Sequence, residues 1–466
     1  MSEQTKLERL SAARLEAGKA SSARERLVKL FDENTFAELD ALVKCGGAGC
    51  GVITGYGEID GATVFAFSQD VSARGAAVGS SQAKKIVKLY EMAVKTGAPV
   101  VGVYDSKGAD IAEGNGMLAA YREILSAANN LSGVVPQVSL VLGVCGGLSA
   151  MAACAADFVI MSEKAELFLT PPAVAKDGAV AGTAEAAQKS GTAQIVTSDE
   201  DEAIAKARQL LSMLPANNLS AAATFDFSEP QTASLLDTIE STLHETTKCD
   251  LVRAIADEGS FLLIGSGFGQ GAHTALCTLS GFTVGMVTAG GVLDHDGAAR
   301  IARFVSVCDS FQIPVVTMIN TEGFAPAGAE ELAGSIRDIA RLSHVYAEAT
   351  TPKVALITGS AVGSAYVALS QADLTLAWPN ASISALPVSA AVAFLKGGEI
   401  TAQKSREQVE AEYKDNEASA LRAAEEGFVS DIIDPKDTRE ELIKALDMLS
   451  GKRVSRLPKK HSNLPM

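Results

Sequence analysis

The stretch Ala98-Pro99-Val100-Val101, followed by Gly108, decides the fold of this 466-residue chain. It returns 215 positions later as Ile313-Pro314-Val315-Val316, followed by Gly323. In both places a short apolar run that begins with proline and β-branched residues is typical of a buried strand, and the glycine marks the loop after it.

A second pattern returns at almost the same offset. Val138-Ser139-Leu140, followed by Gly147, matches Val354-Ala355-Leu356, followed by Gly363, 216 positions later. Two spaced patterns at nearly one offset indicate a duplicated domain. The period is far longer than the ~20–50 residues of a solenoid repeat.

The order of elements predicts an α/β fold. Helical spacing over residues 81–96 and about 116–131 alternates with buried strands at 99–104 and 134–144, which implies right-handed βαβ crossovers. Before them, residues 51–68 are typical of an antiparallel or mixed meander. We expect domains at 1–225 and 226–466, with the polar stretch from about 214 to 248 as a linker.

Composition narrows the class of protein. The chain is 47% hydrophobic but only 5% aromatic, and its net charge of −16 argues against a nucleic-acid or anionic-membrane surface. The longest apolar run, 134–156, is interrupted by glycine and polar residues, so a strand plus a helix is favoured over a membrane span. Seven dispersed cysteines and a polar, charged N-terminus predict reduced thiols, no secretory signal and a cytoplasmic location.

Three familiar kinds of site are disfavoured. Cys45 and Cys50 have no second cysteine pair at zinc-site spacing and the five histidines are isolated, so no metal site is predicted. Ser149 has no histidine between it and His244, where a serine peptidase of the Clp type would need a base. The glycine-rich stretch 265–271 has the spacing GxGxGxG rather than GxGxxG and precedes a strand, which favours a mobile loop over a nucleotide site.

The glycine junctions remain: Gly108 and Gly146-Gly147 in the first half, Gly323 and Gly363 in the second. Backbone N–H groups at such junctions can hold a carbonyl oxygen as it gains negative charge, and losing one such donor costs about 2.7–4 kcal/mol of transition-state stabilisation. The alternative is that these glycines only permit tight turns. Two oxyanion sites without a side-chain nucleophile or base favour a reaction that joins two carbonyl-bearing substrates.

With these features, the chain resembles the carboxyltransferase family of biotin-dependent acyl-CoA carboxylases and decarboxylases, of the propionyl-CoA carboxylase β-subunit and methylmalonyl-CoA decarboxylase α-subunit type. The resemblance covers nearly the whole chain. Among the stretches that carry it are Gly51-Val-Ile-Thr-Gly-Tyr-Gly, Ser132-Gly-Val-Val-Pro-Gln, Met213-Leu-Pro-Ala-Asn-Asn, Asp257-Glu-Gly-Ser-Phe, Tyr346-Ala-Glu-Ala-Thr-Thr-Pro-Lys-Val and Leu457-Pro-Lys-Lys-His-Ser-Asn-Leu-Pro.

The resemblance implies two tandem crotonase-like domains, the first holding acyl-CoA and the second carboxybiotin. It also implies an active site at a subunit interface of a homo-oligomer, such as a hexamer or a dimer of such units. The acyl thioester oxygen is expected near Gly108, Gly147 and Leu148, and the ureido oxygen of biotin near Gly323, Phe324, Ser364 and Ala365. Ala109, Gly146 and Gly363 are expected beside them as residues that bind the cofactor and the CoA ester.

The resemblance further implies that biotin arrives on a separate carrier protein, since the chain has no Ala-Met-Lys-Met attachment site. The other expected partner is a biotin carboxylase or a membrane decarboxylase subunit. The resemblance is compatible with acetyl, propionyl, methylmalonyl or glutaconyl groups as the acyl part of the substrate, and with either carboxylation or decarboxylation as the reaction.

Some positions depart from the family pattern, and a non-catalytic assembly subunit is therefore the alternative function. These positions are Lys107, Asp110, Leu148, Ala327 and Ser364.

Overall fold

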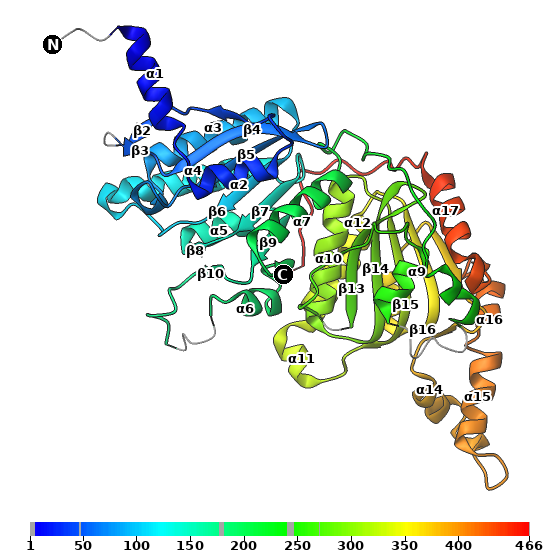
Figure 1. Cartoon of the computed structure of the whole chain (residues 1–466). Coiled ribbons are helices and arrows are strands. Elements are labelled where there is room, and N and C mark those ends of the chain that lie inside the picture. Colours follow the sequence, from blue (N-terminus) through cyan, green and yellow to red (C-terminus); the bar gives the residue numbers. More distant parts are fainter. Residues whose placement is uncertain (1–4, 46–47, 177–180, 240–246, 270, 466) are drawn as a thin grey trace. The chain divides into compact units, whose positions relative to one another are not determined.

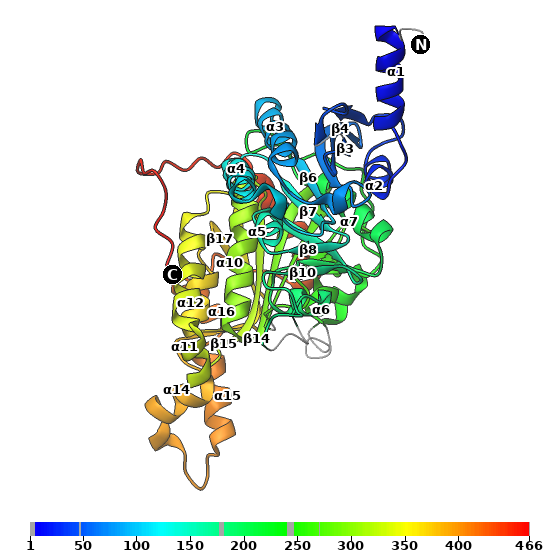
Figure 2. The ribbon, with the colours of Figure 1, turned by 90° about the vertical axis from the view of Figure 1, so that its left-hand side faces the viewer.

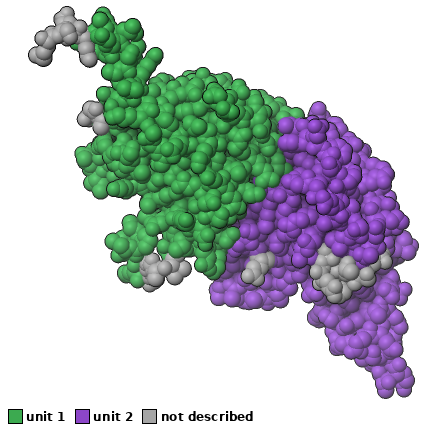
Figure 3. Space-filling model, in the orientation of Figure 1, with its two compact units in different colours: residues 1–222 green, residues 223–466 purple. Residues whose placement is uncertain are grey.

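The computed structural model describes residues 5–45, 48–176, 181–239, 247–269 and 271–465. Two compact units make up the chain, Met1–Ala222 and Ala223–Met466, whereas the sequence predicted a boundary after residue 225 (Figure 3). The structure describes all seven cysteines, and none of them forms a disulfide. Among the described residues, no helix combines the length and the apolar character that crossing a bilayer requires.

A seven-stranded mixed sheet forms the centre of unit 1, in the order β1-β4-β5-β6-β7-β9-β11 (Figure 1). The first two pairings are antiparallel and the others are parallel. Two small ribbons, β2–β3 and β8–β10, lie outside this order. The strands are β1 (Ala37–Leu39), β2 (Lys44–Cys45), β3 (Ala48–Gly49), β4 (Val52–Ile59), β5 (Ala62–Gln69), β6 (Val100–Tyr104), β7 (Gln137–Val141), β8 (Val144–Gly146), β9 (Phe158–Ser162), β10 (Glu166–Phe168) and β11 (Ile195–Thr197).

Helices cover both faces of this sheet (Figure 2). On one face α3 (Ser80–Thr96), α4 (Asn115–Leu131) and α5 (Leu148–Cys154) share a core with the strands, and on the other lie α2 (Ser22–Leu30) and α7 (Glu200–Met213). Helix α3 buries Ile86, Leu89, Tyr90 and Ala93 at the spacing of one helical face. The remaining helical segments are α1 (Lys6–Ala17), η1 (Arg74–Ala76), η2 (Ile111–Glu113) and α6 (Ala184–Lys189).

Unit 2 repeats this sheet strand for strand. Its order is β12-β13-β14-β15-β16-β17-β19, again with two antiparallel pairings followed by parallel ones, and β18 pairs with β16. The duplication inferred from the sequence is therefore confirmed in the topology. The strands are β12 (Leu262–Ile264), β13 (Ala272–Leu279), β14 (Phe282–Leu293), β15 (Val315–Phe324), β16 (Lys353–Val362), β17 (Leu374–Ala377), β18 (Ser382–Ser384) and β19 (Asp431–Ile432).

The helices of unit 2 form the same layers. The pair α10 (His295–Ser310) and α12 (Ser335–Glu348) lies side by side over one face of the sheet, next to α13 (Gly363–Leu369) (Figure 2). The other face packs against η3 (Ala233–Thr238), α9 (Lys248–Ile255) and α17 (Thr438–Leu449). The remaining segments are α11 (Gly328–Ala333), α14 (Val388–Leu395), η4 (Gly397–Glu399), α15 (Arg406–Asn416), α16 (Ala420–Glu425) and η5 (Pro435–Asp437).

The linker predicted at about 214–248 is wrong for part of its length. Leu236 and Ile239 are buried in the core of unit 2, where they join the apolar side chains of α9 and the sheet. Two buried side chains within a polar stretch are too few to produce a periodic pattern, so their burial could not be predicted from the sequence. Residues 240–246 of this stretch lie outside the described residues.

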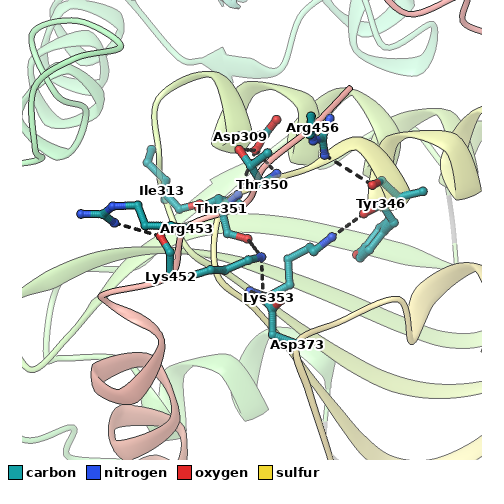
Figure 4. Close-up of polar contacts among 11 residues, drawn as sticks. Asp309, Ile313, Tyr346, Thr350, Thr351, Lys353, Asp373, Lys452, Arg453 and Arg456 are labelled. Carbon is teal, nitrogen blue, oxygen red and sulfur yellow. Dashed lines mark hydrogen bonds and ion pairs between the residues drawn. The ribbon is translucent and has the colours of Figure 1, made fainter. Parts of the chain in front are cut away.

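An Ala-Asp pair that occurs in both units, as Ala156-Asp157 and Ala372-Asp373, links neighbouring strands. Asp157 accepts a hydrogen bond of 2.9 Å from the backbone N–H of Gln137, and Asp373 accepts one of 2.8 Å from Lys353. In unit 2 the ammonium group of Lys452 also pairs with Asp373, at 2.7 Å (Figure 4). The Ala-Asp repeat is thus a structural feature of the sheet.

The C-terminal segment docks on unit 2. Beyond Lys452, Arg456 pairs with Glu348 of α12 at 3.1 Å, and Lys459 and Ser462 contact the same carboxylate. Hydrogen bonds from Lys459 and Ser462 lower the pKa of Glu348 to about 2. Glu348 is therefore a shared contact through which this segment binds α12.

Candidate active site at the glycine junctions

The first junction of unit 1 follows β6. Gly108 has φ +107°, and a Cβ there would have nothing within 4 Å, so the backbone angle rather than the space requires glycine. Its N–H donates to Ser106 Oγ at 3.0 Å, and the buried Ser106 hydroxyl donates to the carbonyl of Ala76 at 2.7 Å. The N–H of Gly108 is therefore already engaged within the chain.

Unit 2 builds its first junction with the same parts. Gly323 has φ +119°, and its N–H donates to Thr321 Oγ1 at 3.2 Å. The Thr321 hydroxyl donates to the carbonyl of Gly291 at 2.6 Å. The hydroxyl residue, the glycine and the accepting carbonyl each lie 215 positions after their counterparts in unit 1. Both units thus place a buried hydroxyl beneath the junction.

In each junction the residue directly after the glycine has an N–H that points away from the segment to which the loop is hydrogen-bonded. The N–H of Val78 donates to Gly108 O, and the carbonyl of Val78 accepts from the N–H of Asp110, both at 2.9 Å. The N–H of Ala109, which lies between these two residues, therefore points away from Val78. Within the described chain the N–H of Ala109 has no hydrogen-bond partner. Phe324 occupies the same position in unit 2. It is the strand partner of Leu293, and the N–H of the next residue, Ala325, donates to Leu293 O at 2.8 Å. Ala109 and Phe324 are therefore the donors that the first junctions offer.

The second junction of unit 1 begins α5. Gly147 has φ +60° and ψ −124°, which only glycine adopts readily, and its N–H donates to Phe168 O at 2.8 Å. Leu148 is the first residue of the helix, so its N–H has no intrahelical partner. Gly146 is required for a different reason, because a Cβ there would lie 2.4 Å from the ring of Phe168. The side chain of Leu148 leaves its backbone donor in place.

In unit 2 the corresponding helix is α13. Gly363 has φ +53°, and a Cβ there would lie 3.0 Å from Ala385 O. Val362 provides no side-chain cap, so the N–H groups of the first turn, which contains Ser364 and Ala365, lack intrahelical partners. The departure at Ser364 therefore keeps the backbone donor as well.

Contacts between neighbouring loops bring the two junctions of each unit together. A Cβ at Gly143 would lie 2.1 Å from Asp105, and one at Gly359 would lie 2.2 Å from Asn320. Across the first contact the N–H of Ser106 also donates to Val144 O at 2.8 Å. Each unit thus gathers its donors at the carboxyl ends of adjacent parallel strands, the edge of an α/β sheet where ligands bind.

A buried arginine that sequence reasoning missed braces the first junction. Arg26 of α2 pairs with Asp105 at 2.8 Å and with Glu200 at 2.6 Å. Burial alone would lower the pKa of Arg26, but hydrogen bonds to Glu200 and Asp105 raise it. The three residues are far apart in the sequence, and no local pattern connects them.

Two departures from the family pattern have structural partners. Asp110 is buried and forms an ion pair with Arg74 of η1, so its charge is compensated. The exposed Lys107 runs along Gly75, where a Cβ would lie 2.7 Å from its side chain. Ala327 is the residue that precedes α11.

The motifs that the sequence disfavoured have structural roles. Ser149 is buried and its hydroxyl lies 2.7 Å from that of Tyr121. Cys50 Sγ lies 3.3 Å from Val43 O, and the described residues contain no cluster of three or more metal-binding side chains. In the glycine-rich stretch, where Gln270 lies outside the described residues, Arg300 donates to Phe268 O at 3.1 Å and holds the turn.

Comparison with known proteins agrees with this geometry. The model of the carboxyl transferase domain matches residues 14–464. The methylmalonyl-CoA decarboxylase subunit alpha of Veillonella parvula is 37% identical, with 96% of this chain and 93% of the relative covered. The propionyl-CoA carboxylase beta chain of Saccharopolyspora erythraea is 35% identical, with 96% and 90% covered.

A solved structure shows the same fold. Transcarboxylase 12S, a hexamer assembly solved with hydrolysed methylmalonyl-coenzyme A bound, superposes with a TM-score of 0.90 at 34% identity, covering 98% of this chain and 95% of that one. This likeness confirms the predicted fold class of two tandem crotonase-like domains. Matched over nearly its whole length in sequence and in fold, the chain belongs to the carboxyl transferase family.

Proposed function

We propose that this chain transfers a carboxyl group between biotin on a separate carrier protein and the α-carbon of a short-chain acyl-CoA. The observation that carries the proposal is the repeated pair of backbone donors, one pair at the sheet edge of each unit. The names of its relatives support the same chemistry, because they include a methylmalonyl-CoA decarboxylase and a propionyl-CoA carboxylase.

In unit 1 the N–H groups of Ala109 and Leu148 would hold the thioester oxygen. Removing a proton or a carboxyl group from the α-carbon places negative charge on that oxygen, and each fixed N–H stabilises it. A single donor of this kind is worth about 2.7–4 kcal/mol in the transition state. Gly108 and Gly147 then set the backbone angles, while their own N–H groups stay bonded to Ser106 and Phe168.

In unit 2 the donor set fits the ureido oxygen of biotin. The N–H of Phe324 and those of Ser364 and Ala365 point out of the ladder and the helix end, and such groups stabilise a carbonyl oxygen that gains negative charge. When bound, biotin supplies the ring nitrogen that carries the carboxyl group. Gly323 and Gly363 hold these donors in place through their positive φ angles.

We further propose that the chain works as a homo-oligomer, such as a hexamer, with a biotin carrier protein and either a biotin carboxylase or a membrane decarboxylase subunit. The hexamer assembly of transcarboxylase 12S supports the oligomer. The seven cysteines, none of which forms a disulfide, support a cytoplasmic location.

The alternative, a non-catalytic assembly subunit, rests on the departures from the family pattern, among them Lys107 and Ala327. One assay separates the two. The purified protein is supplied with free biotin and, in turn, with malonyl-, methylmalonyl- or glutaconyl-CoA, and the release of CO2 is measured. We expect biotin-dependent decarboxylation of one ester. No release from any of them, by a folded protein that still binds CoA esters, would favour the assembly subunit.

A further inference from the structure

In both units a glutamate reaches back from the short helical turn after the first junction to the start of the preceding long helix. In unit 1, Glu113 at the end of η2 accepts hydrogen bonds of 2.7 Å from both the N–H and the hydroxyl of Ser80, which begins α3. In unit 2, Glu330 of α11 accepts one of 3.0 Å from the N–H of His295, which begins α10, and lies 2.8 Å from its ring Nδ1. Ser80 and His295 are equivalent, 215 positions apart.

Each carboxylate closes a loop whose other end is already fixed. The loop that carries Ala109 is bonded to Val78, directly before Gly79 and Ser80, and the loop that carries Phe324 is bonded to Leu293, directly before Asp294 and His295. One short segment in each unit therefore grips the junction loop at two points. We call these two-point contacts the Glu113 clamp and the Glu330 clamp.

We propose that Glu113 and Glu330 are positioning residues for the oxyanion donors Ala109 and Phe324, and that the Glu330 clamp responds to pH through His295 while the Glu113 clamp does not. This inference rests on the proposed function, because it takes Ala109 and Phe324 as the donors. The difference between the clamps is chemical: the serine hydroxyl does not titrate near neutral pH, and the imidazole does.

The surroundings of His295 favour its charged form. The hydrogen bond with Glu330 is the main reason that the pKa of His295 is raised, and the same bond lowers the pKa of Glu330. Asp296 lies 3.3 Å from the other ring nitrogen. The charged groups around His295 are Asp294, which caps the N-terminus of α10, Asp296 of α10, Glu330 of α11 and Asp338 of α12. Asp338 in turn pairs with Arg337 and Arg341.

The sign of the pH response follows from these directions. A raised histidine pKa means that the clamp is strong below the ordinary histidine pKa and weakens as the pH rises through the raised value. The lowered pKa of Glu330 keeps its carboxylate charged down to acidic pH. The ion pair is therefore intact in a window between the two values, and it is lost on the alkaline side.

Glycine at position 79 explains why the Glu113 clamp forms without a histidine. A Cβ at Gly79 would lie 2.4 Å from Glu113 Oε1, so glycine allows the carboxylate to approach the helix end closely. Unit 2 has Asp294 at the equivalent position, and its carboxylate accepts a 2.6 Å bond from Gly297 N instead. The extra acidic residue in unit 2 supplies part of the field that favours a charged His295.

The test exchanges the two residues. His295→Ser gives unit 2 a hydroxyl that does not titrate near neutral pH, and Ser80→His gives unit 1 an imidazole that does. Biotin-dependent decarboxylation of the active CoA ester is measured from about pH 6 to about pH 9, with kcat/KM for free biotin and for the ester obtained separately. For the wild type we expect kcat/KM for biotin to fall about tenfold on the alkaline side, and we expect His295→Ser to abolish that fall. An unchanged alkaline fall in His295→Ser would overturn the inference.

Glu330→Gln and Glu113→Gln form the matched pair that tests positioning. Glutamine keeps an acceptor for the backbone N–H but loses the charge, so we expect Glu330→Gln to lower kcat/KM for biotin about tenfold with KM for the ester unchanged. Glu113→Gln should lower kcat/KM for the ester instead. Equal effects of both variants on both substrates would indicate a general structural role and overturn the inference.

Hydrogen exchange of the peptide that contains Phe324 gives a readout that does not need activity. We expect Glu330→Gln to speed its exchange about tenfold and the peptide that contains Ala109 to stay unchanged. A wild type that is inactive with every ester would refute the proposed function. Unchanged exchange in Glu330→Gln would refute the clamp itself, so the two failures are distinct.

Discussion

The two units are alike in the backbone of their glycine junctions and differ in the side chains beside those junctions. Both keep a hydroxyl beneath the first glycine, at Ser106 and Thr321, and both keep positive φ angles at the junctions. The neighbouring strand-end residue is Asp105, paired with Arg26, in unit 1, whereas in unit 2 it is Asn320, bonded to the N–H of Ser360. The comparison shows that the two units kept the same junction backbone while the side chains around it diverged, and the proposed function assigns a different ligand to each unit.

Gly363→Pro is expected to have the largest effect on one unit while sparing the other. Proline fixes φ near about −65°, whereas Gly363 has φ +53°, so the first turn of α13 and its N–H groups must move. We expect carboxyl transfer to fall by at least about 100-fold, while binding of the CoA ester by unit 1 persists. Turnover and ester binding are measured on the same preparation, and circular dichroism checks the fold.

The mirror variant Gly147→Pro sharpens the same test. It should weaken the ester side of the reaction and leave the biotin side intact. Normal turnover in Gly363→Pro would remove α13 from the proposed site.

Next in size are Gly108→Ala and Gly323→Ala. Both positions have open space for a methyl group but φ angles of +107° and +119°, so the cost is conformational, about 1–3 kcal/mol of unfolding free energy each. Urea unfolding measures it, with Gly397→Ala as the control, because that glycine has open space and no positive φ. Similar losses in both units would show that the junction backbones are equivalent, and a loss no greater than that of the control would contradict the account.

Removing the hydroxyl beneath each junction should have an effect no larger than this. Thr321→Val removes the hydroxyl partner of the N–H of Gly323 and of the carbonyl of Gly291, at about 1–3 kcal/mol. Ser106→Ala removes the partner of the N–H of Gly108, but the carbonyl of Ala76 keeps a hydrogen bond of 3.3 Å from Gln82, so the loss should be smaller in unit 1. Thr321→Ser restores the hydroxyl and should recover both stability and turnover. If the serine variant behaves like the valine variant, packing by the methyl group of Thr321 is the cause instead.

The smallest effect is expected from Glu348→Gln, which acts only on the C-terminal segment of unit 2. The pKa of Glu348 is lowered to about 2, so its contribution to stability is present above its ordinary pKa and is lost as the pH falls toward 2. We expect the variant to be less stable than the wild type at neutral pH and equally stable near about pH 2. The difference in urea midpoint between the two proteins, followed with pH, measures this, and a constant difference would exclude the ionised carboxylate as its source.

The sequence was sufficient for the duplication, because apolar strands and glycines recur at fixed offsets, and the helices after them follow from their periodicity. It was not sufficient for the direction of individual N–H groups. Gly108 was expected to lie at the oxyanion site, but its N–H is bonded to Ser106, which depends on the orientation of a side chain. The Glu113 and Glu330 clamps escaped detection because their offset is 217 rather than 215, and Arg26 because its partners are remote in the sequence.

The backbone donors at Ala109 and Phe324 have a consequence for how freely the chain can change. A donor that belongs to the peptide bond survives every substitution except proline at its own position. Mutational drift at Leu148 or Ser364 therefore alters the rim of the site without deleting the group that the chemistry needs. This tolerance fits a chain that is only 34% identical to transcarboxylase 12S and still superposes on it with a TM-score of 0.90.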